Sequence, residues 1–276
     1  MKVAVFGAGI MGSGIAQVFA EHGHEVLLFA SSPASAQKHK DKLAAFLEGR
    51  VAKGKADAAA VAATIDNIKI CEESAAADVD LVVEAINENM DYKKAFWAKV
   101  DALVGPQAVF ASNTSSLSIT EMAAGLTHQL VGMHFFNPAP LMPLIEVIRG
   151  ANTSDEAFSF IYELSKQLGK EPVEVAEAPA FVVNRMLVPM INEATHLLEM
   201  GVASADDIDK AMRLGASHKI GPLALGDLIG LDVVLAVMET IQAETGDQKY
   251  APTLLLRKMV RSGKLGRKTG EGFFKY

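Results

Sequence analysis

Two polar residues interrupt apolar runs in a pattern that can support acid–base chemistry. His134 lies within residues 131–136 and Glu146 within residues 144–148, and both runs are otherwise largely apolar. A buried carboxylate without a partner is strongly unfavourable. If the two segments approach each other, Glu146 can fix the tautomer of the His134 imidazole, which then transfers protons through its other nitrogen. The alternative is an exposed Glu146 and a core His134 bonded to backbone.

A glycine-rich turn follows the first apolar run, residues 3–6, which predicts a strand. Glycines at this G-x-G-x-x-G spacing also arise by chance and serve ordinary turns. Between a strand and a helix, however, such a turn presents backbone N–H groups and the helix dipole to a pyrophosphate. The turn therefore predicts a dinucleotide site. Its residues are Gly7, Gly9, Ile10, Met11 and Gly12.

The end of the second predicted strand, residues 25–29, lacks the acidic residue that commonly binds the adenosine ribose. Ala30, Ser31 and Ser32 stand at this place instead. Loss of a carboxylate removes the repulsion that excludes a 2′-phosphate, although no arginine stands nearby to bind one. The sequence favours NAD and leaves NADP open. The serines can equally cap the next helix.

Three further groups of residues are candidates for ligand contacts. Residues 112–116 follow a predicted strand at the edge where such sheets bind ligands, and Asn184 interrupts an apolar helical stretch. Lys53 and Lys55 supply local positive charge suited to the phosphates of coenzyme A. The alternative for residues 112–116 is helix capping, and the alternative for Asn184 is a buried amide bonded to backbone. Lys53 and Lys55 can instead lie at a solvated helix end.

The order of elements positions these residues in an α/β fold. Strand-like runs occur at 3–6, 25–29, 79–83, 108–111, 130–135 and 144–148, with helical patterns between most of them. This alternation predicts a Rossmann-like, mostly parallel sheet with helices on both faces. Residues 33–63 predict a helical insertion with a basic turn at 53–55. We expect a nucleotide-binding domain at 1–179 and a smaller all-helical domain at 180–276.

Composition narrows the class of protein. The chain has 276 residues, a net charge of −7 and one cysteine, Cys71. The charge provides no general attraction for nucleic acid or an anionic membrane, and one cysteine cannot form an intrachain disulfide. The apolar stretch 222–238 contains Asp227 and Asp232, which disfavours a membrane span. We expect a cytoplasmic protein without a metal site, and a ligand held by local groups.

Taken together, the motifs resemble the short-chain 3-hydroxyacyl-CoA dehydrogenases over the whole chain, with the bacterial (S)-3-hydroxybutyryl-CoA dehydrogenases as the most similar branch. The resemblance is carried by the glycine turn, Glu84-Ala85, residues 112–117, 134–138 and 146–148, Phe181-Val182-Val183-Asn184-Arg185, and the tail 266–274. It implies a hydride transfer between a nicotinamide cofactor and the 3-position of a 3-hydroxyacyl-CoA. It also implies a homodimer formed through the helical domain.

The resemblance assigns roles to individual residues. It makes His134 the base for the 3-hydroxyl proton and Glu146 its orienting partner, with Ser115 and Asn184 on the reacting oxygen and thioester region. Lys53 matches a position that meets coenzyme A. The expected cofactor contacts are Gly7, Gly9, Ile10, Met11, Gly12, Ala30, Ser31, Ala85, Glu88, Lys93, Asn113, Ser115, Asn137 and Lys268.

Three departures from the family pattern limit this transfer. Ala30 replaces the usual acid, Ala180 stands where the family usually has glycine, and residues 217–219 read Ser-His-Lys in place of Asn-His-Pro. If position 180 requires a positive φ, alanine there would shift Asn184 slightly.

Two other classes of protein share parts of the pattern. A dehydrogenase of free 3-hydroxy acids has a similar glycine turn and helical second domain. The catalytic pattern of that class is based on a lysine, however, and His134 and Glu146 do not fit it. A non-catalytic protein on this fold is the second alternative. The presence of His134, Glu146, Ser115 and Asn184 together argues against it.

Overall fold

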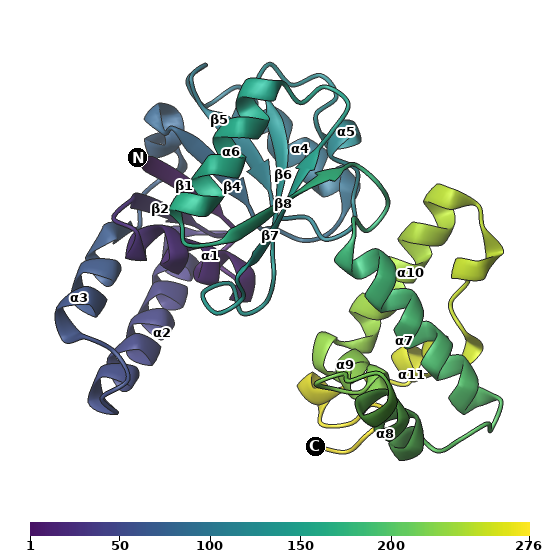
Figure 1. The fold of residues 1–276 in the computed structure, drawn as a ribbon. Coiled ribbons are helices and arrows are strands. Elements are labelled where there is room, and N and C mark those ends of the chain that lie inside the picture. The colour runs from purple at the N-terminus through teal and green to yellow at the C-terminus, as the bar shows by residue number, and fades with distance from the viewer. The chain divides into compact units, whose positions relative to one another are not determined.

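The computed structural model describes residues 1–276, which divide into two compact units, Met1–Glu177 and Ala178–Tyr276. The first unit is built on an eight-stranded sheet with the order β3-β2-β1-β4-β5-β6-β7-β8 (Figure 1). Every neighbouring pair is parallel except β6 and β7. The predicted mostly parallel sheet is therefore confirmed. The strands are β1 (Lys2–Phe6), β2 (Glu25–Phe29), β3 (Ile68–Lys69), β4 (Leu81–Glu84), β5 (Val109–Ser112), β6 (Leu130–Phe135), β7 (Leu144–Arg149) and β8 (Glu171–Ala176).

Helices cover both faces of this sheet. Successive residues of a strand point to opposite faces, so each strand contributes apolar side chains to both layers of helices. Ala111 of β5 belongs to one apolar cluster with Phe19 of α1 and Ile161 of α6, whereas its neighbour Phe110 stacks on Trp97 of α4 with ring centroids 4.9 Å apart. The helices of the first unit are α1 (Ile10–Glu21), α2 (Pro33–Ala52), α3 (Ala58–Asn67), α4 (Met90–Asp101), α5 (Ile119–Met122) and α6 (Asp155–Gln167), with the 3-10 helix η1 (Glu73–Asp78).

The predicted helical insertion is the pair α2 and α3. Ser32 caps α2 by accepting a hydrogen bond from Ser35 N at 3.2 Å, and Pro33 occupies the first helical position, where its missing N–H costs nothing. Lys53 is the C-cap of α2, so the expected basic turn does join the two helices. The helices pack on each other, and both contact α1.

Two strands are absent from the sequence prediction. β3 has only two residues and offers no periodicity. β8 lies at the sheet edge, and only one of its six residues is fully buried. An edge strand with one solvated face and a proline within it carries a weak apolar signal.

The second unit is all-helical, as predicted. It contains α7 (Val183–Glu199), α8 (Ala205–Gly215), α9 (Pro222–Ile229), α10 (Leu231–Thr245) and α11 (Leu254–Arg261), with η2 (Gln248–Tyr250) and η3 (Arg267–Thr269). Its core packs Val188 and Ile191 of α7 against Val234 and Met238 of α10. No helix of the chain combines the length and the apolar composition that a membrane crossing requires.

A buried carboxylate fixes the C-terminal tail to this helical core. Asp227 of α9 is 1% exposed and accepts hydrogen bonds from Phe273 N and Phe274 N, both at 2.9 Å, and from the Tyr276 hydroxyl at 3.1 Å. Three donors replace the water that this carboxylate loses on burial. The apolar stretch 222–238 thus forms α9 and the first half of α10, with Asp227 satisfied inside the unit.

Two departures from the family pattern fall at strained backbone positions. Ala180 has a φ of 61° and Ser217 a φ of 58°. The left-handed region costs a residue with a Cβ atom about 1 kcal/mol or more, whereas glycine and asparagine adopt it readily. Position 180 therefore does require a positive φ. The Ala180 methyl group is buried in the core of the second unit, and its packing offsets part of this strain.

Candidate active site

His134 and Glu146 face each other across the one antiparallel pair of the sheet. The register of β6 and β7 places the two residues directly opposite, and His134 Nδ1 lies 2.7 Å from Glu146 Oε2. Both are buried, with 4% and 1% exposure. This excludes an exposed Glu146 and a histidine that binds backbone at Nδ1. The carboxylate fixes a proton on Nδ1, so the lone pair of the neutral ring resides on Nε2.

The glycine turn has the geometry that its spacing predicts. Gly7 has a φ of 100°, and a Cβ atom there would lie 2.3 Å from the carbonyl oxygen of Ala85. A Cβ atom on Gly12 would lie 1.6 Å from the Gly7 carbonyl oxygen. Gly9 is different, because nothing lies within 4 Å of its Cβ position, and it caps α1 without a side chain. Packing thus requires Gly7 and Gly12, while Gly9 leaves open space at the helix N-terminus for a ligand.

A cavity of about 480 Å³, the β2 cavity, lies beside this turn. Phe6 and Phe29 stack in its wall with centroids 4.5 Å apart, and Ala30 and Ser31 lie at the end of β2. Ser32, by contrast, is used in capping α2. The cavity lining consists of Phe6, Gly7, Phe29, Ala30, Ser31, Glu73, Ile86, Tyr92, Ala95, Phe96 and Lys99. Glu73 and Lys99 form an ion pair with each other.

Glu88 and Lys93, both expected at the cofactor, belong to a hydrogen-bond network with Glu84, which was not among the predicted site residues. Lys93 is 1% exposed and its Nζ lies 2.5 Å from Glu84 Oε1 and 3.2 Å from Glu88 Oε2. Glu84 also accepts hydrogen bonds from the Ser112 hydroxyl at 2.7 Å and from Ile86 N at 2.8 Å. The sequence pattern that could have identified Glu84 is an acidic residue at the end of an otherwise apolar run. A similar pattern identified Glu146.

This network holds the polar loop that follows β5. Glu88 Oε1 accepts hydrogen bonds from Ser115 N at 2.7 Å and from the Thr114 hydroxyl at 2.6 Å. Asn113 Oδ1 accepts a hydrogen bond from Phe135 N at 2.8 Å, next to His134 on β6. The structure thereby links the loop that carries Ser115 to the strand that carries the candidate base.

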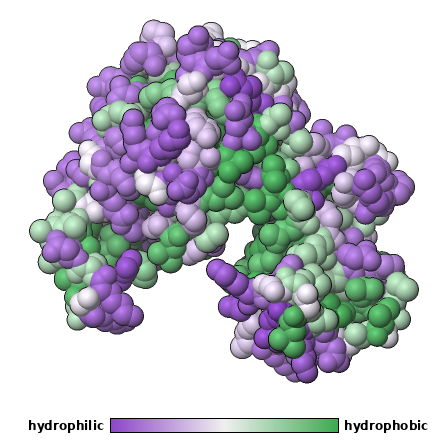
Figure 2. Space-filling view, in the orientation of Figure 1, coloured by the Kyte–Doolittle hydropathy of each residue, from purple (hydrophilic) through white to green (hydrophobic).

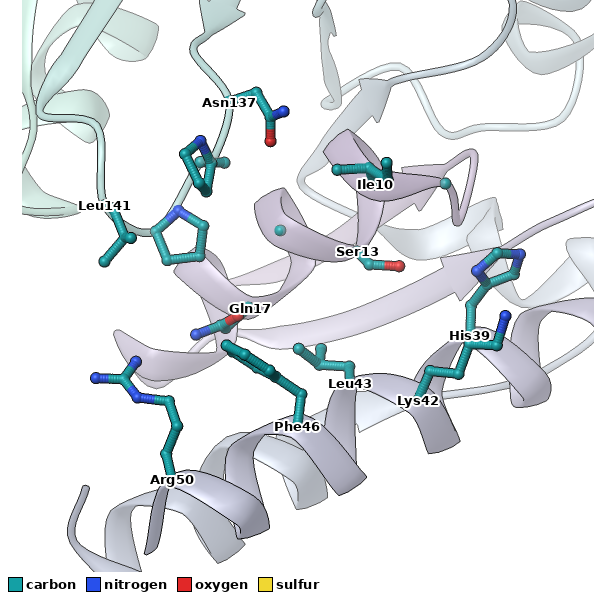
Figure 3. Close-up of a pocket in the computed structure, with 15 residues that line it drawn as sticks. Ile10, Ser13, Gln17, His39, Lys42, Leu43, Phe46, Arg50, Asn137 and Leu141 are labelled. Atoms are coloured by element: carbon teal, nitrogen blue, oxygen red, sulfur yellow. The ribbon is translucent and has the colours of Figure 1, made fainter. Parts of the chain in front are cut away.

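A second cavity, of about 540 Å³, lies between α1, α2 and the loop after β6, and we call it the α2 cavity (Figure 3). Its lining consists of Gly9, Ile10, Ser13, Gly14, Gln17, His39, Lys42, Leu43, Phe46, Arg50, Asn137, Pro138, Ala139, Pro140 and Leu141. Asn137, a predicted site residue, is among them. Lys53 is not, since it lies at the exposed end of α2 beyond Arg50.

The α2 side chains of this cavity were not among the predicted site residues. His39, Leu43, Phe46 and Arg50 recur every three or four residues, so they share one face of a helix. Figure 3 shows this face of α2 directed at α1 and the loop. The stripe combines cationic and apolar groups, and its spacing was the signal that could have found it.

Two predicted site residues lie in the second unit. Asn184 is in the first turn of α7. Lys268 lies in η3, and its Nζ lies 2.5 Å and 2.6 Å from the two carboxylate oxygens of Asp232.

Comparison with known proteins agrees with this arrangement. Residues 2–178 match the NAD binding domain of 3-hydroxyacyl-CoA dehydrogenase, and residues 181–276 match the C-terminal domain of the same enzyme. The chain is 49% identical to the 3-hydroxybutyryl-CoA dehydrogenase of Clostridioides difficile, over 100% of this chain and 99% of that one. It is 41% identical to human mitochondrial hydroxyacyl-coenzyme A dehydrogenase, over 99% and 90%.

A solved structure extends the likeness to the fold. The (S)-3-hydroxybutyryl-CoA dehydrogenase of Ralstonia eutropha superposes with a TM-score of 0.93 at 47% identity, covering 100% of this chain and 98% of that one. Both family domains and full-length relatives match, so this chain belongs to the 3-hydroxyacyl-CoA dehydrogenase family.

Proposed function

We propose that this protein interconverts (S)-3-hydroxybutyryl-CoA and acetoacetyl-CoA with NAD as its cofactor. The observation that carries the proposal is the buried His134–Glu146 pair, held at 2.7 Å in the same unit as an open dinucleotide turn. The names of the full-length relatives support the choice of a four-carbon acyl group.

The proton chemistry follows from the tautomer that Glu146 imposes. His134 takes the proton of the 3-hydroxyl group during oxidation and returns it to the 3-oxo group during reduction. Glu146 stabilises the imidazolium that forms, because its carboxylate accepts the Nδ1 hydrogen bond in both protonation states. We assign Ser115 and Asn184 to the reacting oxygen and thioester, as hydrogen-bond donors that orient them.

The residues of the first unit fit a dinucleotide. The open space at Gly9 and the unfilled N-terminus of α1 would receive the pyrophosphate, with Ile10 and Met11 in the same turn. When bound, the nicotinamide supplies the hydride acceptor or donor. We assign the adenosine end to the β2 cavity, at Ala30 and Ser31. The remaining proposed cofactor contacts are Ala85, Glu88, Lys93, Asn113, Ser115, Asn137 and Lys268.

The α2 cavity has the chemistry that coenzyme A requires. His39, Lys42 and Arg50 offer cationic or protonatable groups for phosphates, while Phe46 and Leu141 offer apolar surface. We therefore propose that the CoA part of the substrate binds along α2, with Lys53 at its exposed end. These local cations explain how a chain with a net charge of −7 can hold a polyanionic substrate.

The direct test is the loss of reduced-nicotinamide absorbance when acetoacetyl-CoA is added to the purified protein with NADH. Parallel reactions contain acetoacetate without coenzyme A. Rapid oxidation of NADH with the thioester alone is the expected result. Activity with the free acid alone would instead indicate the free-acid dehydrogenase class, and no activity with either would indicate a non-catalytic protein.

Replacing Glu146 by glutamine should lower kcat roughly tenfold to a hundredfold or more, by analogy with carboxylates that orient a metal-ligating histidine. Glutamine can still accept the Nδ1 hydrogen bond, but it cannot stabilise the imidazolium by charge. The measurement is kcat for acetoacetyl-CoA reduction, with the KM for NADH as the internal control. An unchanged kcat would contradict the proposed role of Glu146.

The absence of an acid at position 30 predicts a relaxed cofactor preference. We expect the protein to accept NADPH as well as NADH, and Ala30→Asp to raise the NADH-to-NADPH ratio of kcat/KM about tenfold or more, since the carboxylate repels a 2′-phosphate. Gln37→Glu adds the same charge on an exposed position of α2 and serves as the control. A ratio that Ala30→Asp leaves unchanged would exclude position 30 as the determinant.

We further propose a homodimer formed through the helical unit. Support comes from large apolar side chains that this unit exposes. Figure 2 shows hydrophobic surface, in green, on this unit. They include Met186, Met200, Val202, Leu214, Leu228 and Leu254, each more than half exposed. Light scattering after size-exclusion chromatography should give twice the mass of one chain. The mass of a single chain would contradict the proposal.

A further inference from the structure

Lys170 is a buried cation that the reaction described above does not use. It follows α6 and directly precedes β8, and the residue is 8% exposed. Its Nζ forms no ion pair, although burying an ammonium group without an acid is unfavourable. Burial lowers the pKa of Lys170, an effect that the charge of Glu21 opposes. Hydrogen bonds must therefore offset the unfavourable burial of the Lys170 ammonium group.

The ammonium group receives them from the loop between β6 and β7. Lys170 Nζ donates to the carbonyl oxygens of Ala139 at 2.7 Å, Met142 at 2.9 Å and, more weakly, Pro140 at 3.4 Å. An ammonium group has three donors, so these carbonyls use all of them. The loop connects the strand that carries His134 to the strand that carries Glu146.

The loop has few other means of satisfying its backbone. Residues 137–143 include prolines at 138, 140 and 143, none of which has an N–H group to donate. The two internal hydrogen bonds run from Leu141 N and Met142 N to the Pro138 carbonyl oxygen, both at 3.0 Å. The carbonyl oxygens of Ala139, Pro140 and Met142 accept hydrogen bonds from outside the loop, and their donor is Lys170.

Lys170 itself is rigidly placed. Its backbone N–H donates to the Ser165 carbonyl oxygen at 3.1 Å at the end of α6, and the next residue, Glu171, donates to Pro143 at 2.8 Å as β8 begins. On the other side of the loop, Ala139 packs against Gly14 of α1, where an added Cβ atom would lie 3.3 Å from the Ala139 methyl group. The loop is therefore held between a buried cation and α1.

The same loop forms one wall of the α2 cavity, through residues 137–141. We propose that Lys170 is a positioning residue for the CoA thioester: it fixes loop 137–143 in the shape that closes this side of the α2 cavity. The inference rests on the proposed function for the identity of the ligand. The anchoring of the loop rests on the hydrogen bonds alone.

The test compares Lys170→Met, which keeps the length of the side chain and removes its donors, with Lys170→Arg, which retains donors. For Lys170→Met we expect the KM for acetoacetyl-CoA to rise about tenfold, while kcat falls less than about threefold. The KM for NADH should rise by a smaller factor, since Asn137 is the one proposed cofactor contact on the loop. Lys170→Arg should recover part of the loss. Lys166→Met, on an exposed lysine of α6, is the matched control.

Hydrogen exchange supplies a readout that does not depend on the substrate. The amides of Leu141 and Met142 should exchange at least tenfold faster in Lys170→Met, because their acceptor at Pro138 lies in the released loop. Unchanged exchange, or equal increases in both KM values, would overturn the proposal. So would faster exchange with an unchanged KM for acetoacetyl-CoA.

The proposed function is tested separately by the wild-type protein. If the wild type does not oxidise NADH with acetoacetyl-CoA, the proposed function fails, and the exchange rates still decide whether Lys170 anchors the loop. Should Lys170→Met not fold, Lys170→Gln retains an amide donor and allows the same measurements.

Discussion

Replacing His134 by alanine is expected to lower kcat for acetoacetyl-CoA reduction by about a thousandfold, which lies within the usual range for a general acid–base residue. Binding of NADH should remain nearly unchanged, because the glycine turn and the β2 cavity involve β1, α1, β2, η1 and α4 but no residue of β6. Steady-state kinetics give kcat, and fluorescence titration of NADH gives its dissociation constant. Full activity of the variant would remove His134 from the mechanism.

A second buried histidine provides a contrast with His134. His128 Nδ1 lies 2.6 Å from Asp101 Oδ1, and its Nε2 lies 3.0 Å from the Gly105 carbonyl oxygen. Burial by itself raises the pKa of Asp101, but the hydrogen bonds from His128 and Thr127 outweigh it and lower this pKa to about 2. Both ring nitrogens of His128 thus meet acceptors, an arrangement suited to holding a structure together.

The position of each histidine relative to β6 fits the different roles that we propose for them. His128 lies two residues before β6 begins, whereas His134 is the last but one residue of that strand. In a sheet of this kind, ligands bind beyond the carboxyl ends of the parallel strands. We therefore expect His128→Asn to lower the stability of the protein while the folded fraction retains its kcat. It is the natural control for His134→Ala.

The contact between His134 and Glu146 was predictable, because a buried carboxylate in an apolar run requires a partner. Glu146 required a partner, and His134 was the polar residue of the preceding strand-like segment. The antiparallel register of β6 and β7 then makes the two residues directly opposite neighbours. The glycine turn was predictable for a similar reason, since Gly7 and Gly12 lie where no Cβ atom fits.

Other parts of the site depend on contacts that one segment of sequence does not reveal. Lys170 pairs with carbonyl oxygens, which every residue carries, so its partners have no sequence signature. Lys93 looks like an ordinary helix lysine, and only the fold shows that it is buried beside Glu84. β8 was not predicted, because an edge strand exposes most of its residues to solvent and therefore has a weak apolar pattern.

The buried Lys93–Glu84 pair leads to the largest predicted effect on stability. Lys93→Met should lower the free energy of unfolding by about 3–5 kcal/mol, because it leaves the Glu84 carboxylate, 0% exposed, without its cation. Denaturant unfolding monitored by circular dichroism measures the change. Lys94→Met is the matched control: the adjacent lysine pairs with Glu121 at the surface, and its loss should cost less than about 0.5 kcal/mol.

A double variant shows whether the loss of stability in Lys93→Met comes from the missing ion pair or from the unpaired charge that remains on Glu84. If the unpaired Glu84 carboxylate is responsible, Glu84→Gln combined with Lys93→Met should be more stable than Lys93→Met alone. The double variant should still be less active than the wild type, because Glu88 would lose the ammonium group beside the loop that carries Ser115. If the single and double variants were equally stable, Lys93 would stabilise the fold through its packing and not through the effect of its charge on Glu84.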